Sequence, residues 1–146
     1  MLSWVEDRPA VRWALVIPGS LGAAIAALFP LHWVILIGTA GQDSDGLSLW
    51  DLPPRRLEQF GAALVVPLTI VYVAAKIAPA HRFGAAMVVA IVLTAGLGLL
   101  YGSALGGGLD LNDRFPLNIL PLVFNAIGIA VGVNSARGLP ASFGMR

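Results

Sequence analysis

The sequence predicts an all-α integral membrane protein, a compact bundle of four transmembrane helices whose N- and C-termini both lie in the cytoplasm. Of the 146 residues, 58% are hydrophobic and only 12% are charged, whereas a soluble domain carries about 25% charged residues. The apolar residues also come in four long blocks, each close to the roughly 20 residues that a membrane helix needs. Together these observations predict a single membrane domain over residues 1–146.

The first predicted span covers residues 16–37 and contains a proline near its end. Pro30 removes a backbone hydrogen bond, so we expect the helix to kink there. An alternative is a helix that ends at Phe29, followed by a short segment over residues 31–37 that lies along the membrane surface. The sequence leaves this choice open.

A cleaved signal peptide is a further alternative for the N-terminal region. Arg8 and Arg12 precede an apolar run that contains the small-x-small pattern Ala24–Ala26, which is typical of a cleavage site. The hydrophobicity continues past this pattern over residues 28–37, which favours a helix that is retained in the mature protein.

The second predicted span covers residues 57–76, and Asp51 with two following prolines precedes it. An Asp N-cap with proline in the first turn is a helix-start signal. Bulky and β-branched side chains occur nearly all round this segment, so we expect it to face lipid. Pro67 near its centre leaves the carbonyl of Ala63 without its usual donor, which predicts a kink, with a hinge as the alternative.

The third and fourth predicted spans cover residues 83–105 and 115–134. The connection over residues 77–82 is short, so it predicts an antiparallel hairpin between the second and third spans. Three consecutive glycines end the third span and begin the polar connection over residues 106–114. The tail covers residues 135–146, and after Arg137 it has no periodicity.

The distribution of Lys and Arg predicts which ends of the spans are cytoplasmic, because cytoplasmic connections carry an excess of these residues. Six of the nine lie in the N-terminal segment, between Lys76 and Arg82, and in the tail, and three lie in the connections over residues 38–56 and 106–114. The connections over residues 38–56 and 106–114 are therefore expected on the outer side of the membrane. The preference for Arg over Lys, with many Ala, Gly and Val residues, favours a bacterial cytoplasmic (inner) membrane.

Small residues recur every four positions along the third span and again in the fourth. Lipid provides no hydrophobic drive for helix association, so small residues that allow close backbone approach mark the expected helix contacts. Packing within one bundle is favoured, and packing against another subunit stays open. The predicted packing interface consists of Ala86, Ala90, Thr94, Gly98, Gly102, Gly128 and Gly132.

No Asp, Glu, Lys or Arg lies in the core of a predicted span, although ion-coupled transporters, proton relays and voltage sensors need such groups there. The uncharged polar residues are therefore the candidates for a polar lining or a ligand contact. Two asparagines seven residues apart share one face of the fourth span, where interhelical hydrogen bonds are the usual role. The candidates are His32, Thr69, Tyr72, Asn118 and Asn125.

Several functional classes lack their residues in this sequence. Without cysteine there are no disulfides and no Cys-based zinc or iron–sulfur sites. The two histidines fall on opposite sides of the membrane in the predicted topology, and the basic residues do not cluster as nucleic-acid binding requires. The segment Asp43–Gly46 lacks the bidentate glutamate of a calcium loop. We expect no metal, no cofactor, no nucleic-acid partner and no catalytic residue.

The sequence thus favours a small non-catalytic multi-pass membrane protein. It would be an accessory or structural subunit that contacts the lipid bilayer and packs through small-residue helix faces against a protein partner or a second copy. The alternative is a carrier or pore for a small neutral or apolar solute, lined by the span-four asparagines with Thr69 and Tyr72. An enzyme that acts on lipid-soluble substrates through His32 is a third hypothesis.

Overall fold

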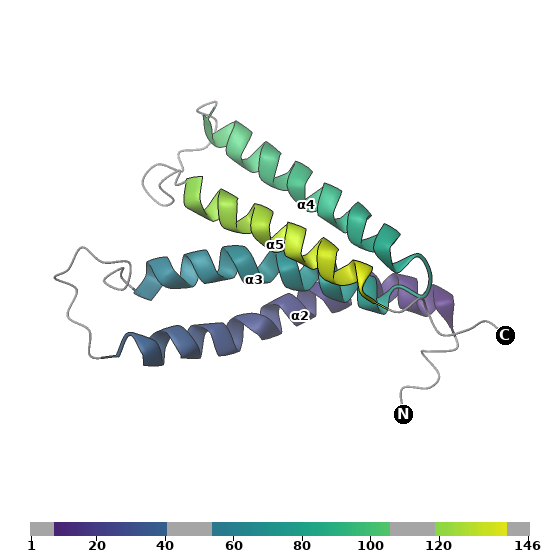
Figure 1. Ribbon diagram of the computed structural model, residues 1–146, viewed down its shortest axis with the longest axis horizontal. Helices are drawn as coiled ribbons and strands as arrows, with labels where there is room; N and C mark the ends of the chain where they lie inside the picture. Colours follow the sequence, from purple (N-terminus) through teal and green to yellow (C-terminus); the bar gives the residue numbers. More distant parts are fainter. Residues whose placement is uncertain (1–7, 41–53, 106–118, 140–146) are drawn as a thin grey trace.

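A computed structural model describes residues 8–40, 54–105 and 119–139, and the elements in these ranges are four α-helices (Figure 1). Each helix is long and apolar enough to cross a membrane. The all-α fold with four membrane-length helices is therefore confirmed. The helices are α2 (Pro9–Gly38), α3 (Pro54–Ile77), α4 (Arg82–Leu105) and α5 (Ile119–Arg137).

The helix α2 is continuous for 30 residues and contains two internal prolines. Pro9 occupies the first turn, where its missing N–H would have no partner in any case. At the other end, the hydroxyl of Thr39 donates to the carbonyl of Ile35 at 2.8 Å. The alternative of a helix that ends at Phe29 is wrong, because α2 continues through Pro30. Its length of about 45 Å exceeds the roughly 30 Å hydrocarbon core.

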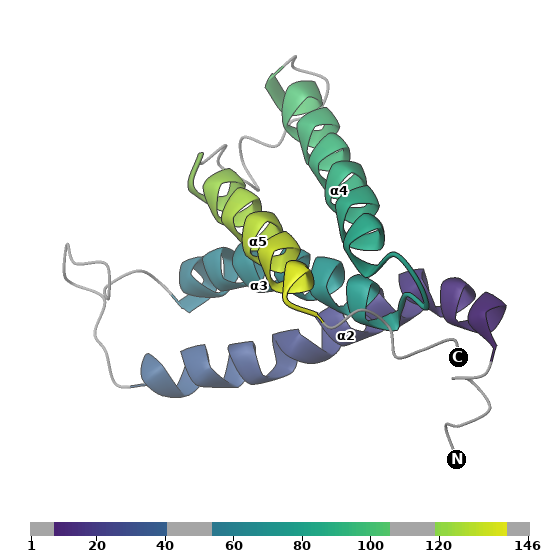
Figure 2. The same cartoon turned by 45° about the vertical axis from the view of Figure 1, so that its right-hand side comes forward.

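The central helix is α3. It packs extensively against α2 and α5 and less extensively against α4, and in the described part of the chain α2 makes no close backbone contact with α4 or α5 (Figures 1 and 2). Val71, Ala74 and Ala75 of α3 are fully buried. The expectation that this segment faces lipid is wrong, since a helix that is apolar all round also suits a position surrounded by other helices.

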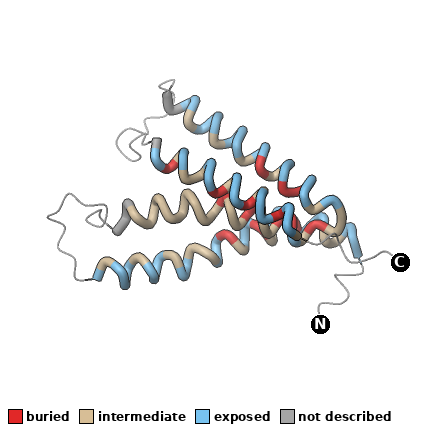
Figure 3. The backbone as a smooth tube through the Cα atoms, viewed as in Figure 1, coloured by how far each residue is buried: buried red, intermediate tan, exposed pale blue. Residues whose placement is uncertain are grey.

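The arrangement is more open than the predicted compact bundle. In both views α4 diverges from α3 towards its C-terminal end (Figures 1 and 2). The buried residues gather where the helices converge, near the start of α2 and the end of α5 (Figure 3). We call this the Arg12 end and the opposite one the Glu58 end. Most of the buried core residues are alanines, which let the helix backbones approach closely.

A tight turn over residues 78–81 joins α3 to α4. Pro79 cannot continue α3, since it has no N–H to donate. His81 has a positive φ of 50°, a left-handed conformation that is uncommon outside glycine but enriched in histidine. Its carbonyl accepts the N–H of Ala85 at 2.9 Å, so His81 begins the hydrogen bonding of α4. The helices α3 and α4 therefore run antiparallel.

Candidate functional site

The predicted small-residue interface lies in three different surroundings. In the first, two glycines of α5 lie against the backbone of α3. A Cβ at Gly128 would overlap the carbonyl oxygen of Leu64 and lie 2.9 Å from Cγ of Pro67. A Cβ at Gly132 would lie 3.0 Å from Cβ of Val71. Both glycines are buried, and Gly128 in particular leaves no room for a side chain.

The second group is the N-terminal half of the α4 stripe. Ala86 is fully buried and Ala90 is 6% exposed, and both belong to one cluster with Val71 and Ala75 of α3 and Ala136 of α5. This half of the stripe therefore packs inside the chain, where α3, α4 and α5 meet. Small side chains allow the three helices to converge here.

The third group, on the C-terminal half of α4, faces outward. Gly98 and Gly102 are exposed, and a Cβ at either position would have no atom within 4 Å. The neighbouring Leu99 is 76% exposed. Thr94 is also exposed, and its hydroxyl donates to the carbonyl of Ala90 one turn earlier at 2.8 Å. We call Gly98 and Gly102 the α4 glycine face.

An open groove of about 700 Å³ lies beside this face, between α4 and α5. Its α4 wall extends from Met87 to Ala95, and its α5 wall from Ile129 to Arg137. Apolar side chains dominate both walls. The sequence does not indicate this groove, because hydropathy alone does not show which faces of two helices stand apart.

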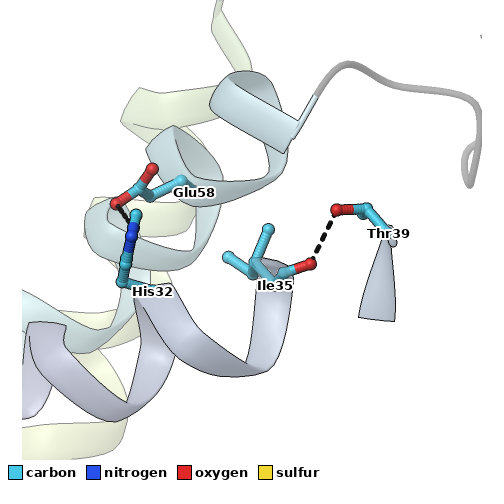
Figure 4. Close-up of polar contacts among 4 residues, drawn as sticks. All are labelled: His32, Ile35, Thr39 and Glu58. Atoms are coloured by element: carbon cyan, nitrogen blue, oxygen red, sulfur yellow. Dashed lines mark hydrogen bonds and ion pairs between the residues drawn. The ribbon is translucent and has the colours of Figure 1, made fainter. Parts of the chain in front are cut away.

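Of the candidate polar residues, His32 has a partner on the next helix that is not among the candidates. Its Nδ1 donates to Oε1 of Glu58 at 2.8 Å, which connects α2 to α3 at the Glu58 end (Figure 4). The two side chains are 52% and 43% exposed. The sequence does contain an indication of this contact. His32 lies late in one span and Glu58 early in the next, and antiparallel packing of consecutive spans brings such positions together.

The other described polar candidates lie on α3 and α5, outside the groove between α4 and α5. The side-chain amide of Asn125 donates to the carbonyl of Pro121 in its own helix at 2.7 Å. The ring of Tyr72 lies 5.9 Å from the ammonium of Lys76, and Thr69 is half-buried on the same helix. None of these residues lines the groove, and Asn118 lies outside the described residues.

Cationic side chains gather at the Arg12 end, and Arg12 and Arg137 connect helices there. The guanidinium of Arg12 donates to the carbonyls of Ile77 at 3.1 Å and Ala78 at 3.4 Å, at the C-terminus of α3. These are carbonyls without helical partners, and a positive charge is favourable beside them. The guanidinium of Arg137 lies 5.3 Å from the centre of the Phe83 ring, which joins the end of α5 to the start of α4.

No protein-family model, no curated protein and no solved structure matches this chain. Within the described ranges, no three His, Asp or Glu side chains come together as a metal site would require. The features that remain as candidates are the α4 glycine face, the groove beside it and the cationic Arg12 end. All three lie on the surface of a multi-pass membrane protein with four candidate spans.

Proposed function

We propose that this chain is a non-catalytic membrane subunit that binds a transmembrane helix of another chain, or of a second copy, through the α4 glycine face. The observation that carries the proposal is the contrast between two pairs of glycines, each with four-residue spacing. The space beside the two glycines of α5 is occupied by α3, whereas the space beside Gly98 and Gly102 is empty. Glycines at this spacing allow two helix backbones to approach closely in lipid.

The composition of α4 supports the same proposal. A glycine inside a helix costs about 1 kcal/mol relative to alanine, because it loses more backbone freedom on folding. At positions 98 and 102 no contact within the described chain requires the absence of a side chain. Close packing of a helix from another chain would explain why these two positions carry no side chain. Exposed leucines at positions 99 and 100 would pack beside it.

We also propose that the Arg12 end is cytoplasmic and that the membrane is the bacterial cytoplasmic one. Of the seven Lys and Arg residues in the described ranges, five are at the Arg12 end, and the two at the other end are Arg55 and Arg56. An excess of these residues is typical of the cytoplasmic side. The five are Arg8, Arg12, Lys76, Arg82 and Arg137.

The test is native mass spectrometry of the tagged protein, extracted mildly from its own membrane. The wild-type chain should carry a stoichiometric second chain, either foreign or identical, and Gly98→Leu should lose it. Gly22→Leu is the matched control, because Gly22 on α2 is also exposed, with no atom within 4 Å of a Cβ. A wild-type chain that is found only as a monomer would overturn the proposal.

The same variants separate the subunit from a carrier. Asn125→Ala should leave association intact, since its amide bonds within α5. A carrier lined by Asn125 predicts the reverse, that is, normal assembly with lower flux of small neutral solutes into reconstituted vesicles. The subunit proposal expects no solute-specific flux from the wild-type chain and no change in the variant.

A further inference from the structure

The groove between α4 and α5 is apolar along its walls and polar at one end. Met87 and Ile91 of α4 face it from one side, and Ile129 and Val133 of α5 from the other. The hydroxyl of Thr94 is bonded within its own helix, so it adds little polarity to the wall. A groove of this kind is suited to a hydrocarbon chain.

Two polar side chains of α5 lie at the end of the groove nearest the Arg12 end. Asn134 and Arg137 are one helical turn apart, both line the groove, and both are exposed. The Arg137 guanidinium lies 5.3 Å from the centre of the Phe83 ring, at the start of α4. Its planar set of N–H donors suits an acceptor with several oxygens. The only acidic residue in the described ranges is Glu58 at the far end, so no described carboxylate neutralises Arg137.

The length of the groove distinguishes between occupants. From Met87 to Ala95 the α4 wall rises about 12 Å, which is less than half of the roughly 30 Å hydrocarbon core. A partner helix that crosses the membrane needs about 20 residues and would extend well beyond the groove. A lipid chain from one leaflet ends near the bilayer centre, and the α4 wall of the groove ends at Ala95, near the middle of α4. The volume of about 700 Å³ is that of a small-molecule site.

We propose that this groove binds one anionic phospholipid from the leaflet at the Arg12 end. An acyl chain lies between α4 and α5, and the phosphate accepts hydrogen bonds from Arg137 and Asn134. An arginine presents several N–H donors in one plane, which matches the oxygens of a phosphate. Basic sites between membrane helices recognise anionic headgroups in this way.

The charge is tested by native mass spectrometry of the full chain in detergent with equimolar phosphatidylglycerol and phosphatidylcholine that carry the same acyl chains. The wild-type chain should retain phosphatidylglycerol in preference. Arg137→Ala should lower the ratio of bound phosphatidylglycerol to phosphatidylcholine about fivefold, the effect expected of one cation near a membrane surface. Lys76→Ala is the matched control, since Lys76 is an exposed cation beside an aromatic ring at the same end, away from the groove, and should change the ratio less than twofold.

The apolar part of the site is tested by Ala130→Trp, which places a large ring at an exposed position of the groove wall. It should reduce the binding of both lipids, with the helical content measured by circular dichroism as the check on folding. Equal binding of both lipids by the wild-type chain would overturn the proposal. So would equal effects of Arg137→Ala and Lys76→Ala, or full lipid binding by a folded Ala130→Trp.

This inference is independent of the partner helix proposed for the α4 glycine face. The groove ends at Ala95, before the face begins. Gly98→Leu should therefore leave the lipid ratio unchanged, and Arg137→Ala should leave association with a partner chain unchanged. Either proposal can fail while the other stands.

Discussion

The Cα of Gly128 in α5 lies against the carbonyl oxygen of Leu64 in α3, so closely that a methyl group at position 128 would overlap that oxygen. The hydrogen that takes the place of this methyl group points at the carbonyl, which is the geometry of a weak Cα–H···O contact. The ring of the buried Pro67 is the next nearest group. The absence of a side chain at position 128 thus allows α3 and α5 to approach each other this closely.

Gly128→Ala should destabilise the fold by about 1–3 kcal/mol, because α5 must move away from α3 to admit the methyl group. The measurement is the free energy of unfolding in detergent micelles. Gly22→Ala is the control, since the same change in open space on α2 should be neutral or stabilising through helix propensity. Equal stability of the two variants would show that the α3–α5 contact is looser than described.

Arg12→Ala should lower the free energy of unfolding by about 1–2 kcal/mol, because the carbonyls of Ile77 and Ala78 lose a charged donor at the end of α3. Arg12→Lys should restore part of this loss, since an ammonium keeps the charge without the planar pair of donors. Arg8→Ala is the control for charge alone. If Arg8→Ala lowers the free energy of unfolding by the same amount, the hydrogen bonds of Arg12 do not stabilise the fold beyond the effect of its charge.

The contact between His32 and Glu58 should contribute less than about 1 kcal/mol, because both side chains are partly exposed and such pairs are worth little. A double-mutant cycle with His32→Ala, Glu58→Ala and the double variant measures the coupling. A coupling well above this value would indicate that the pair is shielded from water in the membrane.

The topology can be measured with single cysteines, because the chain has none of its own. Ser44→Cys lies outside the described residues, in the connection that the sequence places outside. It should react with an impermeant thiol reagent added to whole cells. Arg8→Cys, at the Arg12 end, should react only after the cells are permeabilised. The opposite pattern would reverse the orientation.

Hydropathy was sufficient for the fold class, and local patterns accounted for only part of the site. The all-α class and the number of membrane-length helices follow from uncharged blocks, because backbone groups in lipid must bond within a helix. His32 was singled out from its neighbours in sequence, whereas Glu58, its partner 26 positions away, was not. The small-residue pattern of α4 also did not indicate that Ala86 and Ala90 are buried while Gly98 and Gly102 are exposed.

By itself the sequence determined that this chain forms four membrane-length helices, since length and apolarity are properties of each segment alone. Only the tertiary structure decided that α3 lies at the centre, that Ala86 packs inside while Gly98 faces out, and that an open groove lies between α4 and α5. Lipid and a neighbouring helix are equally apolar surroundings. The hydropathy of a segment therefore indicates only that the segment is kept from water. The shapes of the helix surfaces decide which faces pack against each other.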